Sequence, residues 1–195
     1  CTTFEGDLQP DAFVGSDDNQ SAELAVTALA DAIGGKGKIG MIRGIAGQSS
    51  EVIRGDAAKK LLEEKYPDIE IIAEDIGNWS RDEGMTIMEN WINTYGDEMV
   101  GVFAQNDEMA IGACNALENA GMTGKIQVTG IDLVADAEEY LADGRLAADV
   151  FQDGYGQGYA SVDVALALIN GEDFQKETWI PFELVTKDNM DEYFE

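Results

Sequence analysis

Histidine is absent from the 195 residues, and cysteine and proline are scarce, at two and three residues. Without histidine the chain lacks the commonest general base and cannot build a Ser-His or Cys-His nucleophile. Two cysteines form neither a zinc-binding pattern nor a framework of several disulfides. No window approaches the roughly 18 apolar residues of a membrane-spanning helix. These absences favour a binding protein over an enzyme, and they predict no metal and no cofactor.

Basic residues are also scarce. Lys and Arg number 12 against 39 Asp and Glu, which gives a formal net charge of −27. A chain this acidic repels phosphate backbones and anionic membrane surfaces. We therefore expect no nucleic-acid partner and a strongly solvated surface.

The two cysteines have different interpretations. Cys114 lies in the helical run 110–120 and is expected to be a small core residue. Cys1 is compatible with a lipid-modified amino terminus, and equally with a sequence that simply starts there, which is the interpretation we favour. No signal peptide is present, so an exported protein would carry its signal outside this sequence.

Short β-branched runs alternate with longer segments of helical periodicity. Strands are predicted at Lys38–Arg43, Ile69–Ile76, Met99–Ala104, Ile126–Ile131, Leu146–Phe151 and Trp179–Val185. Helices are predicted at Asn19–Ile33, Glu51–Tyr66, Arg81–Tyr95, Glu108–Ala120, Asp136–Asp143 and Gly158–Asn170. Ser80 with Glu83 forms a capping box at the start of the third helix. The alternation predicts an α/β fold with a parallel sheet flanked by helices on both faces.

Polar and aromatic residues follow the predicted strands at their carboxyl ends. Such ends meet at one edge of a parallel sheet, where α/β proteins bind ligands. The side chains that we expect to converge there are Arg54, Trp79, Asn106, Asp132 and Gln152.

This set of side chains suits a polyhydroxylated ligand. A sugar has an apolar C–H face that packs on an aromatic ring such as Trp79. Asp132 can accept hydrogen bonds from two neighbouring hydroxyls, and Arg54 can donate two. The amides of Asn106 and Gln152 both donate and accept.

Each of these residues also has a simpler structural explanation. Asn106 or Asp107 would cap the following helix. Arg54 could pair with Glu51 or Glu63 on the surface, and Trp79 could pack on the sheet edge. It is their convergence on one edge that favours a binding site.

Several longer stretches resemble the ribose-binding-protein family, the type I periplasmic sugar-binding components of ABC transporters. They are Gly44-Ile-Ala-Gly-Gln-Ser-Ser50 with Arg54-Gly55, then Val102-Phe-Ala-Gln-Asn-Asp-Glu-Met-Ala110, Gly130-Ile-Asp132, Phe151-Gln152 and Leu184-Val-Thr-Lys-Asp-Asn189. The similarity runs from about Ser16 to the end of the chain. The resemblance implies a type I periplasmic-binding-protein fold.

The resemblance also implies a role for individual residues. The family's ligand-binding arginine corresponds to Arg54, its amide to Asn106, its carboxylate to Asp132 and its hinge-side glutamine to Gln152. Ser16 corresponds to a contact at the first crossing between the lobes, and Ile45 corresponds to a residue of an apolar wall. Trp79 stands where the family has a stacking phenylalanine, and Ile131 where ribose binders carry another phenylalanine. Because of these two departures, the ligand is expected among pentoses, hexoses and cyclitols and need not be ribose.

Members of this family have two lobes that close on the ligand about a hinge and then dock on a membrane permease. By this resemblance, residues 18–152 with the tail 184–195 form one complete lobe, of the C-terminal type. Residues 1–17 and 153–183 form hinge and first-lobe segments. The amino-terminal part of the first lobe is then a segment outside this sequence, in the same protein or in a separate chain. The expected location is extracytoplasmic, in the periplasm or lipid-anchored on the outer face of the cytoplasmic membrane.

Three other functions remain open, and one is a receptor domain that feeds a chemotaxis or kinase pathway, either alone or through the transport protein. The effector-binding domain of a lactose-repressor-type regulator resembles the same fold and shares an Asn-Asp-X-X-Ala-X-Gly run, but it would follow a basic helix-turn-helix. A sugar-processing enzyme on a doubly wound sheet is the alternative from another class. Turnover of a bound sugar would indicate the enzyme.

Overall fold

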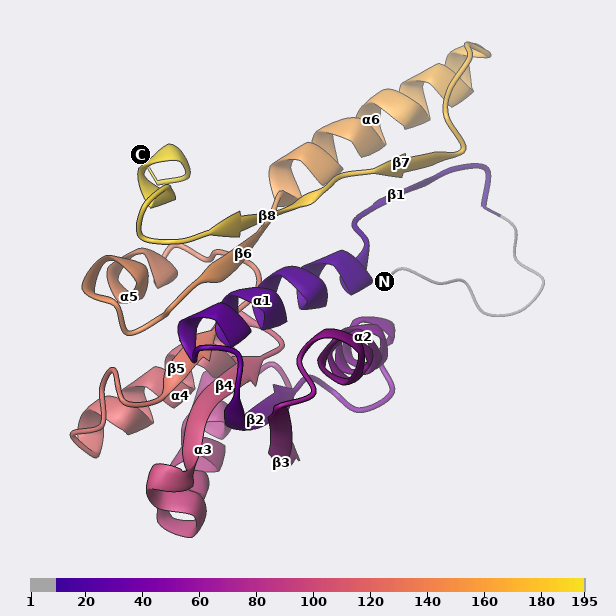
Figure 1. Cartoon of the computed structure of the whole chain (residues 1–195). Coiled ribbons are helices and arrows are strands. Elements are labelled where there is room, and N and C mark those ends of the chain that lie inside the picture. Colours follow the sequence, from indigo (N-terminus) through magenta and orange to yellow (C-terminus); the bar gives the residue numbers. More distant parts are fainter. Residues whose placement is uncertain (1–9, 195) are drawn as a thin grey trace.

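The computed structural model describes residues 10–194 (Figure 1). Cys1, considered above as a lipid attachment site, lies outside these residues. The helices are α1 (Asp18–Ala32), α2 (Ser49–Lys65), α3 (Arg81–Tyr95), α4 (Asp107–Asn119), α5 (Ala137–Asp143) and α6 (Gly154–Asn170). The strands are β1 (Phe13–Gly15), β2 (Gly37–Arg43), β3 (Ile69–Ile76), β4 (Met99–Ala104), β5 (Gln127–Thr129), β6 (Asp149–Gln152), β7 (Glu177–Trp179) and β8 (Phe182–Val185).

The main sheet has the order β3-β2-β4-β5, and all its neighbouring strands are parallel. Isolated bridges from Thr129 to Ala148 and from Asp132 to Phe151 place β6 beside the end of β5, also in parallel. The predicted parallel sheet is thereby confirmed in its first five strands. It is wrong at the far edge, because β8 pairs with β6 in the antiparallel direction.

Two apolar cores lie on the two faces of this sheet. One packs α1 and α2 against side chains such as Met41 and Phe103, and the other packs α3, α4 and α5 around Met88 and Met109. Each large apolar side chain buried in this way contributes roughly 1.5–3 kcal/mol. Cys114 is 2% exposed in the second core, as expected.

Helices α3 and α4 approach each other very closely. A Cβ atom added at Gly112 would lie 2.1 Å from the carbonyl oxygen of Arg81, and one at Gly84 would lie 2.6 Å from that of Met109. Backbone atoms cannot move aside as a side chain can, so these two glycines permit the close packing.

The last predicted strand, Trp179–Val185, is in fact two strands. Pro181 has no N–H to donate to a sheet, and the chain changes partners at this point. Before it, β7 pairs with β1, a strand that the sequence analysis missed; after it, β8 pairs with β6.

Helix α6 lies with β1 and β7 at one end of the molecule, away from the main sheet (Figure 1). It starts at Gly154, four residues earlier than predicted, because Asp153 caps it by accepting a 2.7 Å hydrogen bond from the Gly156 N–H. None of its residues is buried. Across the described residues, no helix combines the length and the apolar character needed to cross a membrane.

Candidate ligand-binding site

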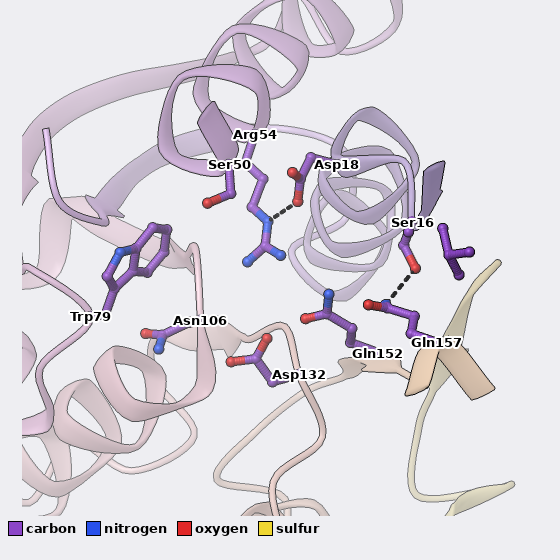
Figure 2. Close-up of a pocket in the computed structure, with 11 residues that line it drawn as sticks. Ser16, Asp18, Ser50, Arg54, Trp79, Asn106, Asp132, Gln152 and Gln157 are labelled. Atoms are coloured by element: carbon purple, nitrogen blue, oxygen red, sulfur yellow. Dashed lines mark hydrogen bonds and ion pairs between the residues drawn. The ribbon is translucent and has the colours of Figure 1, made fainter. Parts of the chain in front are cut away.

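A cavity of about 380 Å³ lies at the carboxyl ends of the main strands, next to the segments that lead to β1 and α6 (Figure 2). It is lined by Val14, Gly15, Ser16, Asp18, Ser50, Arg54, Trp79, Asn106, Asp132, Gln152 and Gln157. Six residues expected from the sequence thus come together there: Ser16, Arg54, Trp79, Asn106, Asp132 and Gln152.

Arg54 projects from α2 and is only 5% exposed. Its Nε donates to Asp18 Oδ1 at 2.9 Å, and its Nη1 donates to the Gln105 carbonyl oxygen at 2.5 Å. The suggested surface pairing with Glu51 or Glu63 is wrong, because Glu51 is itself buried and binds Arg43. A buried guanidinium fixed on two sides keeps its remaining donors aimed at the cavity (Figure 2).

Trp79 forms an aromatic wall of the cavity. Its backbone has φ 61°, and its indole Nε1 donates to Gln48 Oε1 at 2.7 Å. The ring lies against Gly44 so closely that a Cβ there would come within 1.9 Å of it. The Arg54 guanidinium lies 6.0 Å from the ring centroid. The indole is therefore held in one orientation from several sides.

Asn106 combines the two roles considered from the sequence. As the N-cap of α4, its Oδ1 accepts from the Met109 N–H at 3.1 Å. Its side chain also lines the cavity (Figure 2), where its amide nitrogen can donate to a ligand.

Asp132 lies in a strained loop, with φ 132°, and Leu133 after it has φ 58°. Hydrogen bonds to β6 hold the loop: the Asp132 N–H donates to Val150 at 2.9 Å, and the Gln152 N–H donates to the Asp132 carbonyl at 3.2 Å. Burial, followed by the negative charge of Asp107, raises the pKa of Asp132 to about 7. Such a carboxylate gains from hydroxyl donors that offset its desolvation.

Gln152 and Ser16 lie on the two neighbouring segments that leave the main body. The Gln157 side chain, from the first turn of α6, donates its Nε2 hydrogen to Ser16 Oγ at 2.8 Å (Figure 2). The sequence analysis missed Gln157, and it also missed Asp18 and Ser50. Asp18 pairs with Arg54 across 36 residues of sequence, a separation that no local pattern reveals.

Two of the proposed ligand contacts do not reach the cavity. Ile131 is fully buried, because its side chain points into the core beneath α1 and α2. Ile45 is 40% exposed and is not among the lining residues. Neither residue supplies an apolar wall to the cavity in this structure.

The arrangement offers donors, acceptors and one aromatic face to a small polar ligand. Within residues 10–194 no cluster of three or more Cys, Asp or Glu side chains is placed to hold a metal ion. The cavity contains a cation already paired with a carboxylate, a second carboxylate and three amides. These groups suit neutral hydroxyls better than a highly charged ligand.

Residues 3–173 match the model of a family described as periplasmic binding protein domain. The chain is 38% identical to the xylitol-binding protein of Mycolicibacterium smegmatis over 95% of this chain and 51% of that protein. It is also similar to a Bacillus halodurans ABC-transporter solute-binding protein with bound myo-inositol (41% identity, TM-score 0.91, 98% of this chain and 66% of that one). A third similarity is to an Actinobacillus succinogenes solute-binding protein with bound D-allose (33% identity, TM-score 0.89), and it covers 93% of this chain and 63% of that one. The chain thus spans between about half and two thirds of these relatives.

Proposed function

Because the chain belongs to the periplasmic binding protein domain family, we propose that it is part of the substrate-binding component of an ABC transporter. In this proposal the protein captures a monosaccharide or related polyol and delivers it to a membrane permease. The family is one of solute-binding proteins and not of enzymes, in agreement with the sequence analysis.

The observation that carries the proposal is the composition of the cavity. An indole face stands opposite a set of polar groups that can each serve a hydroxyl, with Arg54 donating and Asp132 accepting. Hydrogen bonds to charged groups contribute roughly 1.5–3 kcal/mol each, so a few of them give useful affinity. Sugars and polyols present this combination of an apolar face and adjacent hydroxyls.

The ligands of the three relatives narrow the class of ligand that we expect for this chain. Xylitol, myo-inositol and D-allose differ in ring and chain form but share runs of adjacent hydroxyl groups. We propose that this chain recognises such a run, and that the ligand is a pentose, a hexose, a cyclitol or the corresponding alditol.

The position of the cavity supports capture by hinge closure. Ser16 and Gln152 line it from the segments that connect the main body with β1 and α6, and Gln157 lines it from the first turn of α6. We propose that residues 18–152 and 184–195 form one lobe, and that 1–17 and 153–183 belong to the hinge and the other lobe. A ligand that bridges both lobes stabilises the closed form through its extra contacts.

The surface of α6 supports the assignment to a second lobe. Its exposed apolar side chains include Tyr155 at 83%, Val162 at 58% and Ile169 at 79%. A contiguous apolar surface of this kind marks an interaction site. Since the relatives are longer than this chain, we propose that first-lobe residues outside this sequence cover α6, in the same protein or a separate chain.

An extracytoplasmic location follows from this proposal, either in the periplasm or on the outer face of the membrane through a lipid on Cys1. Mass spectrometry of the membrane fraction checks the anchor. A Cys1 residue without added lipid mass in that fraction would contradict it.

A thermal-shift panel of myo-inositol, xylitol, D-allose and D-ribose tests the proposed function. We expect at least one compound to raise the melting temperature of the chain, and Arg54→Met to abolish this shift. Glu63→Gln, a charge change on the exposed side of α2, is the matched control and should retain it. Because one lobe supplies only part of the contacts, the panel extends to millimolar ligand. If no compound shifts the melting temperature, with or without added first-lobe residues, the proposal is wrong.

A further inference from the structure

Two buried carboxyl groups lie behind the cavity, on the same elements that carry its ligand-binding side chains. Asp107 is the first residue of α4, directly after Asn106, and Asp149 is the first residue of β6, three residues before Gln152. Both residues are 0% exposed. Neither lines the cavity, so ligand contact does not explain their presence.

The hydrogen bonds of the two carboxyl groups leave one oxygen on each without a donor. Asp107 Oδ2 accepts a hydrogen bond from the Val134 N–H at 2.7 Å. Asp149 Oδ1 accepts one from the N–H of the next residue, Val150, also at 2.7 Å. Asp107 Oδ1 and Asp149 Oδ2 are buried and receive no hydrogen bond from an N–H or hydroxyl of the described residues. Backbone hydrogen bonds from Asp107 to Ile131 at 2.9 Å and from Gly130 to Ala148 at 3.4 Å bring the two residues to the same point of the sheet. A hydrogen bond between the two side chains accordingly acts on the pKa of both groups. Two carboxylates cannot satisfy one another, but a carboxylic acid and a carboxylate can.

The surroundings also disfavour two negative charges. Burial raises the pKa of both groups and outweighs the backbone N–H groups of Val134, Leu133 and Val150, which lower it. The charge of Asp149 raises the pKa of Asp107 further, whereas the hydrogen bond with Asp107 lowers that of Asp149. Asp132 after β5 acts on Asp149, and both carboxyl groups of the pair act on Cys114 of α4. The charged groups that act in turn on these two neighbours are Asp18, Arg54 and Glu108 for Asp132, and Asp143 and Arg145 for Cys114.

The two cations in that set have other partners. Arg54 binds Asp18, and Arg145 binds Glu118, Glu139 and Asp143. Within residues 10–194, no salt bridge reaches Asp107 or Asp149. A proton is then what neutralises the pair.

The pair joins the three segments that present Asn106, Asp132 and Gln152. Asp107 holds the strained loop of Asp132 through the Val134 N–H. Asp149 begins the strand that holds the same loop from its other side through Val150 and Gln152. Repulsion between two charged carboxylates at this junction would separate α4 from β6 and move all three side chains.

We propose that Asp107 and Asp149 are positioning residues that share one proton, and that loss of this proton at alkaline pH weakens ligand binding. The inference rests on the proposed function, since it concerns the geometry of the polyol site. The Asp149→Asn amide supplies a permanent N–H to Asp107, so this variant no longer needs the shared proton.

The test is a titration of myo-inositol, and of the other panel compounds if it does not bind, at pH values from about 7.5 to about 10. We expect the wild-type Kd to rise at least about tenfold over this range, and that of Asp149→Asn to rise less than about threefold. If Asp149→Asn does not fold, Asp107→Asn takes its place in the test, because its amide can donate a hydrogen bond to Asp149. A wild-type Kd independent of pH, or an equal rise in the variants, would overturn the inference.

Infrared spectroscopy of the ligand-free protein separates this inference from the proposed function. In the Asp132→Asn variant, where Asp132 with its own pKa of about 7 cannot contribute, a protonated carboxylic acid should give its carbonyl band at neutral pH. Adding Asp149→Asn to this variant should remove the band. If no panel compound binds at any pH, the proposed function fails and the positioning role fails with it, while the band still decides whether the pair shares a proton. Absence of the band would overturn the shared proton even if binding is observed.

Discussion

Asp132→Asn should weaken ligand binding and stabilise the ligand-free protein at the same time. The substitution keeps the shape of the side chain and removes its charge. At pH 8 the wild-type carboxyl, with a pKa of about 7, is ionised in a largely buried position. Since an unfolded Asp has a pKa near 3.9, a shift of this size corresponds to at most about 4 kcal/mol. Partial exposure lowers this energy, so we expect the free energy of unfolding of the variant to exceed that of the wild type by about 2 kcal/mol. For a chain of this length, such a gain raises the melting temperature by about 4–8 °C.

The sign of the pH dependence follows from the raised pKa. Below about pH 4 the carboxyl is protonated in both the folded and unfolded states. As the pH rises toward 7 the unfolded state ionises first, so the folded state loses stability over this window. The variant lacks this loss, and its advantage in melting temperature should be larger at pH 8 than at pH 5.

The effect on ligand binding has the opposite direction. A carboxylate that accepts two hydroxyls loses about 1 kcal/mol per hydrogen bond when a neutral amide replaces it. We therefore expect the Kd measured by calorimetry at pH 8 to rise about thirtyfold. A variant that is less stable than the wild type, or that binds equally well, would refute this account of Asp132.

Three further predictions concern packing, the aromatic wall and charge. Gly112→Ala should lower the free energy of unfolding in urea by at least about 2 kcal/mol, because its methyl group would meet backbone of α3. Gly158→Ala in exposed α6, where nothing lies within 4 Å, should be neutral or slightly stabilising; equal losses in both variants would contradict the packing argument. Gly44→Ala should displace the Trp79 ring and raise the Kd for the ligand about tenfold. Calorimetry measures this Kd, and a value equal to that of the wild type would contradict the prediction. Finally, the net charge of −27 predicts that the melting temperature rises between about 0.1 M and 1 M NaCl, as the screening length falls from about 10 Å to about 3 Å; a flat salt dependence would oppose this.

Periodicity and capping signals were sufficient to place most elements of the main body. The predicted helix Arg81–Tyr95 and strand Met99–Ala104 have the bounds found in the structure. Ser80 does cap α3, accepting from the Glu83 N–H at 3.4 Å. Such local signals depend on neighbouring residues, which a single sequence displays.

Features that depend on distant partners were less accessible. β1 has only three residues and is defined by its pairing with β7, far along the chain. The direction of β8 is set by β6, and nothing in its own residues distinguishes parallel from antiparallel pairing. The strand-end rule brought five side chains to the cavity, whereas the family resemblance also assigned Ile131 there. The alternation of side chains along the strand sends Ile131 to the core instead.

A fluorescence titration tests the central claim most directly, because Trp79 is the one tryptophan among the residues that line the cavity. Addition of a panel polyol should change the emission saturably, with the same Kd as calorimetry. In Trp79→Phe, where Trp91 and Trp179 remain, calorimetric binding should persist more weakly while the emission no longer responds. Binding that leaves the wild-type emission unchanged, or a response that survives in Trp79→Phe, would contradict a polyol site at the carboxyl ends of the sheet.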